Sequence, residues 1–202
     1  KALDRLEDAG AELIHVTLPN VAAFMGTAGF DVMLYEVAVN VARYLAANTE
    51  KPGGGGPITL GEAVDGIASP DVKGLFESIL AEKGGTPVPA ETYAAALEVR
   101  QRLRAEYRTL FSDNDLGALV FPTTVRPATP IADPGTIEEY IHNTDAGSFC
   151  GLPGLALPIG FTADGLPVSL GLDALPGADR SLIAMGMAME RQVFGRLAAP
   201  NI

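Results

Sequence analysis

The sequence has 202 residues, which is long enough for one domain with a sizeable core. Hydrophobic residues make up 48% of it and charged residues 19%, a composition that excludes a disordered chain. Its 14 Lys and Arg residues against 25 Asp and Glu residues give a net charge of −11. That charge argues against nucleic acid or an anionic membrane as a partner, because both bind basic surfaces. The single cysteine excludes a disulfide within the chain and a cysteine-rich zinc site, so we expect a cytoplasmic protein.

The N-terminal quarter predicts a helix, a strand and a second helix. Leu3 and Leu6 keep helical spacing and Gly10 suits a helix C-terminus, but no capping residue precedes them, so we expect the chain to begin inside a helix and to be a fragment. Residues 12–18 are rich in strand formers and end at a proline, which predicts a strand. Residues 30–45 place apolar side chains on one face of a helix.

A glycine-rich segment at residues 51–57 predicts a loop because prolines flank consecutive glycines. We interpret it as a surface excursion between helices, and an interdomain linker is the alternative. Ser69, followed by proline, predicts a helix start, and a long helix is expected over residues 90–111. In that helix, Arg100 and Arg104 either bind a carboxylate or, more simply, form ion pairs and extend to solvent.

The C-terminal half alternates strands and helices. Residues 118–121 are a short apolar run, typical of a central strand that is covered on both faces. Residues 136–140 predict a short helix, residues 155–161 and 166–173 predict two strands joined at an Asp-Gly turn, and a last helix begins at Asp179. The mixture indicates the α/β class.

Most catalytic motifs are missing from the sequence. It contains no G-x-x-x-x-G-K-[ST] phosphate loop, no G-x-G-x-x-G, no H-E-x-x-H and no G-x-S-x-G nucleophile elbow. Cys150 and His142 are the one candidate nucleophile–base pair, but a lone cysteine is usually a small buried hydrophobic residue, and we interpret Cys150 in that way. We therefore assign no catalytic residue to this chain and expect neither a metal nor an organic cofactor.

Residues 143–154 are rich in Gly, Pro and small polar residues and lead directly into a predicted buried strand. Small side chains beside a strand end let a ligand approach the backbone, and clefts at strand ends are the usual ligand sites of open α/β sheets. The segment therefore predicts a ligand-binding loop, and a purely structural turn is the alternative.

Several stretches match one known pattern in chain order. They are residues 11–19 (AELIHVTLP), 69–78 (SPDVKGLFES), 118–124 (ALVFPTT), 143–160 (NTDAGSFCGLPGLALPIG), 164–167 (DGLP) and 179–182 (DRSL). Together they resemble the C-terminal part of the amidase signature family. The stretch at 69–78 is similar to the branch of mandelamide and indoleacetamide hydrolases.

The resemblance implies an α/β fold in which a mixed β-sheet is sandwiched between α-helices. It also implies amide hydrolysis by a Ser–cisSer–Lys triad, with an acyl-enzyme on the nucleophilic serine. The glycine- and serine-rich signature that carries this triad has no counterpart in the sequence. We therefore expect residues 1–202 to be the C-terminal portion of a single amidase domain, inactive alone, with the N-terminal portion of the same amidase as its partner.

The same resemblance places the acyl side of the substrate pocket at Thr144, Gly147, Ser148, Phe149 and Gly151. Many relatives carry an asparagine just before Gly-Leu-Pro, where Ser148 and Phe149 stand here, so Phe149 would narrow the pocket or supply an aromatic wall. Gly147 and Gly151 would leave space for the acyl group. The alternative for Gly151 is a turn glycine at positive φ, where a larger residue would only destabilise the fold.

The predicted function is hydrolysis of small, aryl-substituted carboxamides to a carboxylic acid and ammonia, so a small-molecule amide is the expected ligand. The alternatives are a non-catalytic binding domain and part of an amidotransferase of the same superfamily, which passes ammonia to a charged tRNA. The net charge of −11 counts against a tRNA-facing surface. Neither nucleic acid nor membrane is expected as a partner, and a homodimer is left open.

Overall fold

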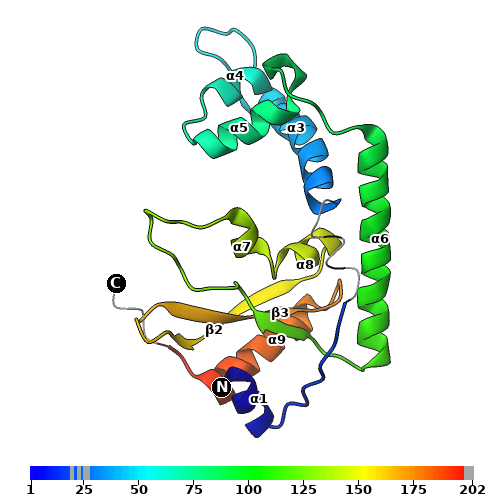
Figure 1. The fold of residues 1–202 in the computed structure, drawn as a ribbon, viewed down its shortest axis with the longest axis vertical. Coiled ribbons are helices and arrows are strands. Elements are labelled where there is room, and N and C mark those ends of the chain that lie inside the picture. Colours follow the sequence, from blue (N-terminus) through cyan, green and yellow to red (C-terminus); the bar gives the residue numbers. More distant parts are fainter. Residues whose placement is uncertain (19–20, 22–23, 25–27, 198–202) are drawn as a thin grey trace. The chain divides into compact units, whose positions relative to one another are not determined.

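The computed structural model describes residues 1–18, 21, 24 and 28–197. The chain forms two compact units (Figure 1). One unit, here called the sheet unit, comprises Lys1–Met25 and Arg100–Ile202, and the other, the helical unit, is Gly26–Val99. The helix α6 (Ala90–Asp113) contributes to both because the boundary lies within it.

The sheet unit is built on three antiparallel strands. They are β1 (Leu119–Pro122), β2 (Gly154–Phe161) and β3 (Pro167–Asp173), and β3 lies in the centre. All three strands were predicted from their apolar sequences, and Asp-Gly forms the turn between β2 and β3. Residues 118–121 were expected as a central strand, but β1 lies at an edge of the described sheet because only β3 pairs with it there. An α/β fold with helices on both faces of the sheet is confirmed, and the pairing among the described strands is antiparallel throughout.

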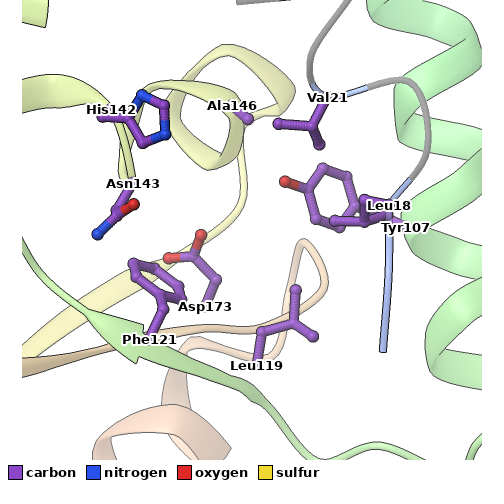
Figure 2. Close-up of a pocket in the computed structure, with 9 residues that line it drawn as sticks. All are labelled: Leu18, Val21, Tyr107, Leu119, Phe121, His142, Asn143, Ala146 and Asp173. Carbon is purple, nitrogen blue, oxygen red and sulfur yellow. The ribbon is translucent and has the colours of Figure 1, made fainter. Parts of the chain in front are cut away.

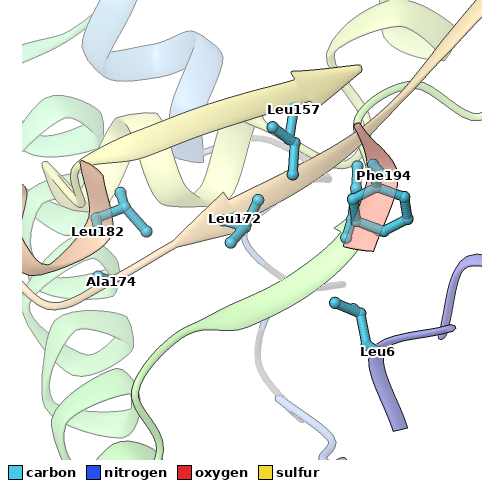
Figure 3. Packing of buried hydrophobic residues seen from close by; sticks show 7 residues of the cluster. Leu6, Leu157, Leu172, Ala174, Leu182 and Phe194 are labelled. Atoms are coloured by element: carbon cyan, nitrogen blue, oxygen red, sulfur yellow. The ribbon is translucent and has the colours of Figure 1, made fainter. Parts of the chain in front are cut away.

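One face of the sheet carries the hydrophobic core of the sheet unit (Figure 3). It is covered by α1 (Ala2–Asp8), α9 (Asp179–Met189) and the π-helical turn η3 (Glu190–Phe194). The buried core residues are Leu6, Leu157, Leu170, Leu172, Ala174, Leu182 and Phe194. Because Leu170 and Leu172 are two positions apart on β3, both side chains point to this face. Burying each such side chain contributes roughly 1.5–3 kcal/mol, so this face anchors the sheet.

The opposite face of the sheet meets the second half of α6 and two short helices, α7 (Ile137–Ile141) and α8 (Asp145–Cys150). The short helix predicted at residues 136–140 is α7, and Thr136 starts it through a capping box with Glu139. The segment 143–154, predicted as a loop, contains α8 instead. A six-residue helix of small residues such as DAGSFC is difficult to predict because it has little apolar periodicity to mark it.

The helical unit consists of α3 (Gly29–Asn48), α4 (Leu60–Asp65), α5 (Pro70–Ile79), the 3-10 turn η2 (Ala81–Lys83) and the start of α6. The glycine-rich loop joins α3 to α4 inside this unit. It is therefore a surface excursion, and the linker alternative is wrong. The loop closes on itself through a hydrogen bond from the Lys51 amide to the Gly56 carbonyl at 2.8 Å.

The helix α4 was not predicted, although its N-terminus carries a capping box of Thr59 and Glu62. The Lys51 ammonium lies 2.8 Å from a Glu62 carboxylate oxygen. The hydrogen bond from Lys51, together with those from Thr59, lowers the pKa of Glu62 to about 2. These contacts tie the start of the glycine-rich loop to the helix that follows it.

The predicted strand at residues 12–18 is wrong. Residues 11–18 form no β-pairing and lie outside the sheet. Residues such as Ile14 and Val16 favour an extended backbone, but a strand also needs a hydrogen-bonded neighbour, and none of the three strands pairs with this segment. Within the described part of the chain, no helix has both the length and the apolar character to cross a membrane.

Candidate functional site

The end of β3 brings a carboxylate to the face of the sheet that lies opposite the hydrophobic core. Side chains alternate along a strand, so Leu172 points into the core and the next residue, Asp173, points away from it. Asp173 lies in register with Leu119 of β1 and Gly154 of β2. An ionisable group thus lies at the end of the central strand, flanked by both neighbouring strands, where apolar residues are usual.

A cavity of about 210 Å³ lies over this face of the sheet (Figure 2). Its walls come from β1, the end of β3, α6, α8 with the connection that precedes it, and the N-terminal segment. The lining residues are Leu18, Val21, Tyr107, Leu119, Phe121, His142, Asn143, Ala146 and Asp173. All of them belong to the sheet unit. An engineered cavity of about 150 Å³ holds benzene, so this one has room for a small aromatic group.

The Asp173 carboxylate is buried at this cavity. The residue is only 9% exposed, and Figure 2 shows its carboxylate turned toward the space between the lining residues. Among the described residues, no hydrogen bond or ion pair reaches this carboxylate. Burial raises the pKa of Asp173 to about 6 because the charged form loses hydration. No Lys or Arg is among the residues that line the cavity.

Two glycines leave room for that carboxylate. Gly147 of α8 faces Asp173 so closely that a Cβ atom at this position would overlap a carboxylate oxygen. A Cβ atom at Gly154 would lie 3.0 Å from the other oxygen. The glycine in α8 is therefore required by the neighbouring aspartate, and α8 can approach the sheet only without a side chain there.

Other polar groups border the same cavity. The Tyr107 hydroxyl is turned toward Asp173 in Figure 2, and burial, with the nearby Cys150 and Asp173 adding to it, raises the pKa of this phenol. The Asn143 side-chain amide donates a hydrogen bond of 2.6 Å to the Pro122 carbonyl, which holds the amide beside β1. The cavity therefore combines apolar walls with a few polar groups, the usual composition of a small-molecule site.

Comparison with known proteins assigns the family. The family model for amidases matches residues 1–183 of the 202. The chain belongs to the amidase family. This confirms the resemblance to the amidase family found in the sequence.

Among curated amidases, the chain is 31% identical to an indoleacetamide hydrolase of Rhizobium radiobacter, an alignment that covers 97% of this chain and 43% of that protein. It is 31% identical to a mandelamide hydrolase of Pseudomonas putida, with coverage of 99% and 40%. The solved peptide amidase of Stenotrophomonas maltophilia superimposes with a TM-score of 0.71 at 26% identity, over 97% of this chain and 39% of that one. The chain thus spans about two-fifths of the length of these amidases.

The five pocket residues predicted from the amidase resemblance lie on or beside α8. Thr144 precedes the helix, and its hydroxyl donates to the Ile141 carbonyl at 3.3 Å instead of capping α8. Gly147 is buried against Asp173, whereas Ser148 is exposed. None of the five is among the residues that line the cavity of Figure 2, although Asn143 and Ala146 of the same segment are.

Phe149 and Gly151 have structural contacts of their own. The Phe149 ring stacks on Phe24 with 4.3 Å between centroids, and the Arg100 guanidinium lies 5.6 Å from the Phe149 centroid. Gly151 ends α8 in the left-handed region at φ +70°, and a Cβ atom there would lie 3.1 Å from Arg104. Gly151 is thus a turn glycine, so a valine at this position would strain the backbone whether or not the residue also faces substrate.

Cys150 is a buried packing residue, as its sequence context indicated. It is completely buried, and burial raises the pKa of its thiol to about 11, an effect that Arg104 and Arg100 partly oppose. The Arg104 Nε donates a hydrogen bond of 2.7 Å to the Cys150 carbonyl, so this arginine holds the end of α8. A thiol that stays protonated is a poor nucleophile.

Sequence reasoning missed Asp173, Tyr107 and the cavity that they border. Tyr107 was expected only as part of the long helix over residues 90–111, and Asp173 was expected only as the last residue of a strand. One signal for Asp173 was available in the sequence. Side chains alternate between the two faces of a strand, so an acid that directly follows the core residue Leu172 must lie on the opposite face of the sheet. No group of three or more His, Cys, Asp or Glu side chains that could hold a metal ion occurs among the described residues.

Proposed function

We propose that this chain is the C-terminal portion of an amidohydrolase that converts small, aryl-substituted carboxamides to the carboxylic acid and ammonia. The observation that carries the proposal is the similarity to an indoleacetamide hydrolase and a mandelamide hydrolase over 97% and 99% of this chain. Both names denote an acetamide that bears an aromatic group. The enzyme acts in the cytoplasm, and the partner of this chain is the N-terminal portion of the same amidase.

In the proposed enzyme, the Ser–cisSer–Lys triad lies outside this chain. The nucleophilic serine attacks the amide carbonyl, ammonia leaves, and water hydrolyses the acyl-enzyme. The chain itself supplies sheet strands and one wall of the pocket. On the acyl side, that wall consists of Thr144, Gly147, Ser148, Phe149 and Gly151, whose small side chains, Phe149 excepted, admit the acyl group.

The test is ammonia release by the complete protein from indole-3-acetamide, mandelamide and unsubstituted acetamide. We expect kcat/KM to be at least about 10-fold higher for the aryl amides than for acetamide, because each apolar contact in a pocket contributes roughly 1–3 kcal/mol to discrimination. Hydroxylamine should divert the acyl-enzyme to the aryl hydroxamate. Residues 1–202 alone serve as the control and should release no ammonia.

Two outcomes would overturn the proposal. Ammonia release from glutamine only when a charged tRNA is present would identify part of an amidotransferase instead. Tight binding of an aryl amide without any turnover by the complete protein would identify a binding domain.

A chelator should leave hydrolysis unchanged, since the proposed chemistry uses serine and no metal.

A further inference from the structure

We propose that the cavity over the β3 end is a binding site for a small aromatic primary ammonium group, with Asp173 as its counter-ion. Nothing in the proposed amide hydrolysis uses this carboxylate, and the ligand-binding experiment below does not depend on that function.

The first argument is the missing partner of a buried acid. Asp173 is 9% exposed, and no described residue gives it a hydrogen bond or an ion pair. Removing a carboxylate from water is costly unless a donor or a cation compensates for the lost hydration. Because no Lys or Arg is among the described residues that line the cavity, the compensating group comes from outside the part of the chain that the structure describes.

The second argument is that the fold preserves this carboxylate by specific means. Gly147 and Gly154 leave the space that its two oxygens occupy, and side chains at either position would crowd them. A chance buried acid could rotate toward solvent, but here α8 and β2 close around it. The carboxylate is held at the cavity, where a bound group can reach it (Figure 2).

The third argument is the chemistry of the walls. Leu119, Phe121 and Ala146 are apolar, so they suit a hydrocarbon body rather than an inorganic cation. The cavity of about 210 Å³ exceeds the roughly 150 Å³ that benzene needs, which leaves space for a ring with a short ammonium arm. The Tyr107 and Phe121 rings can also face a cation favourably. A carboxylate, an apolar body and aromatic rings together select an arylalkyl ammonium group.

Benzylamine is the probe, and its binding to the complete protein is measured by isothermal titration calorimetry at pH 7.5. Benzyl alcohol has nearly the same size and hydrogen-bonding group but no charge. We expect benzylamine to bind at least 10-fold more tightly than benzyl alcohol. Asp173→Asn keeps the volume and removes the charge, so it should cut benzylamine affinity at least 10-fold and leave benzyl alcohol unchanged.

Two further variants complete the test. Asp164→Asn removes an exposed acid from the β2–β3 turn and should leave benzylamine affinity unchanged, which controls for net charge. Ala146→Leu fills the cavity and should weaken both ligands. The melting temperature of Asp173→Asn is recorded alongside, to show that the variant is folded.

Three results would overturn the proposal. They are a failure of the folded wild-type protein to bind benzylamine, equal affinity for benzylamine and benzyl alcohol, and unchanged benzylamine binding by Asp173→Asn. The first would also be the result if a basic side chain from another part of the protein already occupied the cavity. Turnover of the uncharged indole-3-acetamide is assayed separately, so loss of this site and loss of the proposed function are distinguishable.

Discussion

Asp173 carries a negative charge where burial disfavours one, so its titration makes stability depend on pH. Its pKa of about 6 in the folded protein lies above the ordinary value near 3.9. The folded state therefore binds the proton more tightly, and stability falls as the pH rises from about 4 to about 6. Above about pH 6, the full free-energy cost of burying the ionised Asp173 carboxylate reduces the stability of the folded protein. The other titratable side chains that line the cavity are Tyr107 on α6 and His142 after α7, and a substitution of Asp173 alone leaves both residues unchanged.

The first prediction follows from this loss of stability with rising pH. Without any amine present, Asp173→Asn should raise the free energy of unfolding at pH 8 by about 1–3 kcal/mol and have almost no effect near pH 4. Urea unfolding of the complete protein at both pH values measures the difference. A variant that is equally destabilised at both pH values would show instead that the carboxylate makes a favourable contact.

The second prediction concerns the close approach of Gly147 to Asp173. Gly147→Ala should destabilise the protein by about 1–3 kcal/mol, because the added methyl group overlaps the carboxylate. In an Asp173→Ala background, the same change should cost much less, since the overlapping atoms are gone. A double-mutant cycle measures this coupling. Additive effects of the two substitutions would mean that Gly147 is required for another reason.

The third prediction concerns Cys150. Because the residue is completely buried and its thiol has a pKa of about 11, Cys150→Ala should leave kcat of the complete enzyme within a few-fold of the wild type. Kinetics on indole-3-acetamide measure this. A loss of about 10³-fold or more, the scale on which a nucleophile matters, would give the cysteine a catalytic role.

At the scale of elements, helix ends in this chain depend on a few side chains. The capping box of Thr59 and Glu62 starts α4, and the Lys51–Glu62 ion pair holds the loop before it. Thr59→Ala should lower the free energy of unfolding by about 1 kcal/mol, because it removes the hydroxyl that accepts from the Glu62 amide. Urea unfolding is the measurement.

Ser112→Ala is the matched control for Thr59→Ala. It removes an exposed hydroxyl near the end of α6 and should change stability by less than about 0.5 kcal/mol. If the two variants behave alike, the capping box contributes nothing measurable to the helical unit.

The elements show which parts of the fold can be predicted from sequence. The strands β1, β2 and β3 are apolar runs bounded by Pro, Gly or an Asp-Gly turn, and their own residues determine them. Residues 12–18 have the composition of a strand, but pairing depends on a neighbour that composition does not reveal. The helix α8 has the reverse problem, because its small residues suit both a loop and a helix packed tightly on a sheet.

The candidate site was harder to predict than the fold for a similar reason. The segment 143–154 drew attention because of its small residues, and Asn143 and Ala146 do border the cavity. Tyr107 of α6 and Asp173 at the end of β3, which complete the polar part of the cavity, are tens of residues away from this segment in sequence. Only tertiary packing places Tyr107 opposite Asp173, and no local pattern contains that information.

At the scale of the whole molecule, several large apolar side chains are exposed. They include Val39 and Tyr44 of α3, Val72 of α5, and Ile183 and Met187 of α9. In the described sheet, β1 and β2 are edge strands. Exposed apolar surface and open strand edges favour association with another chain or segment.

Residues 1–202 alone should therefore bind a hydrophobic dye and tend to aggregate. Adding the N-terminal portion of the amidase should suppress dye fluorescence, because it would cover these surfaces. Fluorescence titration and light scattering measure both effects. A chain that melts sharply as a monomer and binds no dye would contradict this expectation.

The alternation of Leu172 and Asp173 along β3 has a consequence for folding itself. A slip of β3 by one residue against β1 and β2 would turn every side chain to the opposite face. Asp173 would then enter the core among Leu157 and Leu182, and two leucines would move out to the cavity face. An unpaired acid in a hydrocarbon core is far more costly than one at a cavity. The same aspartate that destabilises the native sheet thus penalises its misregistered alternative more heavily, so it selects the correct strand alignment.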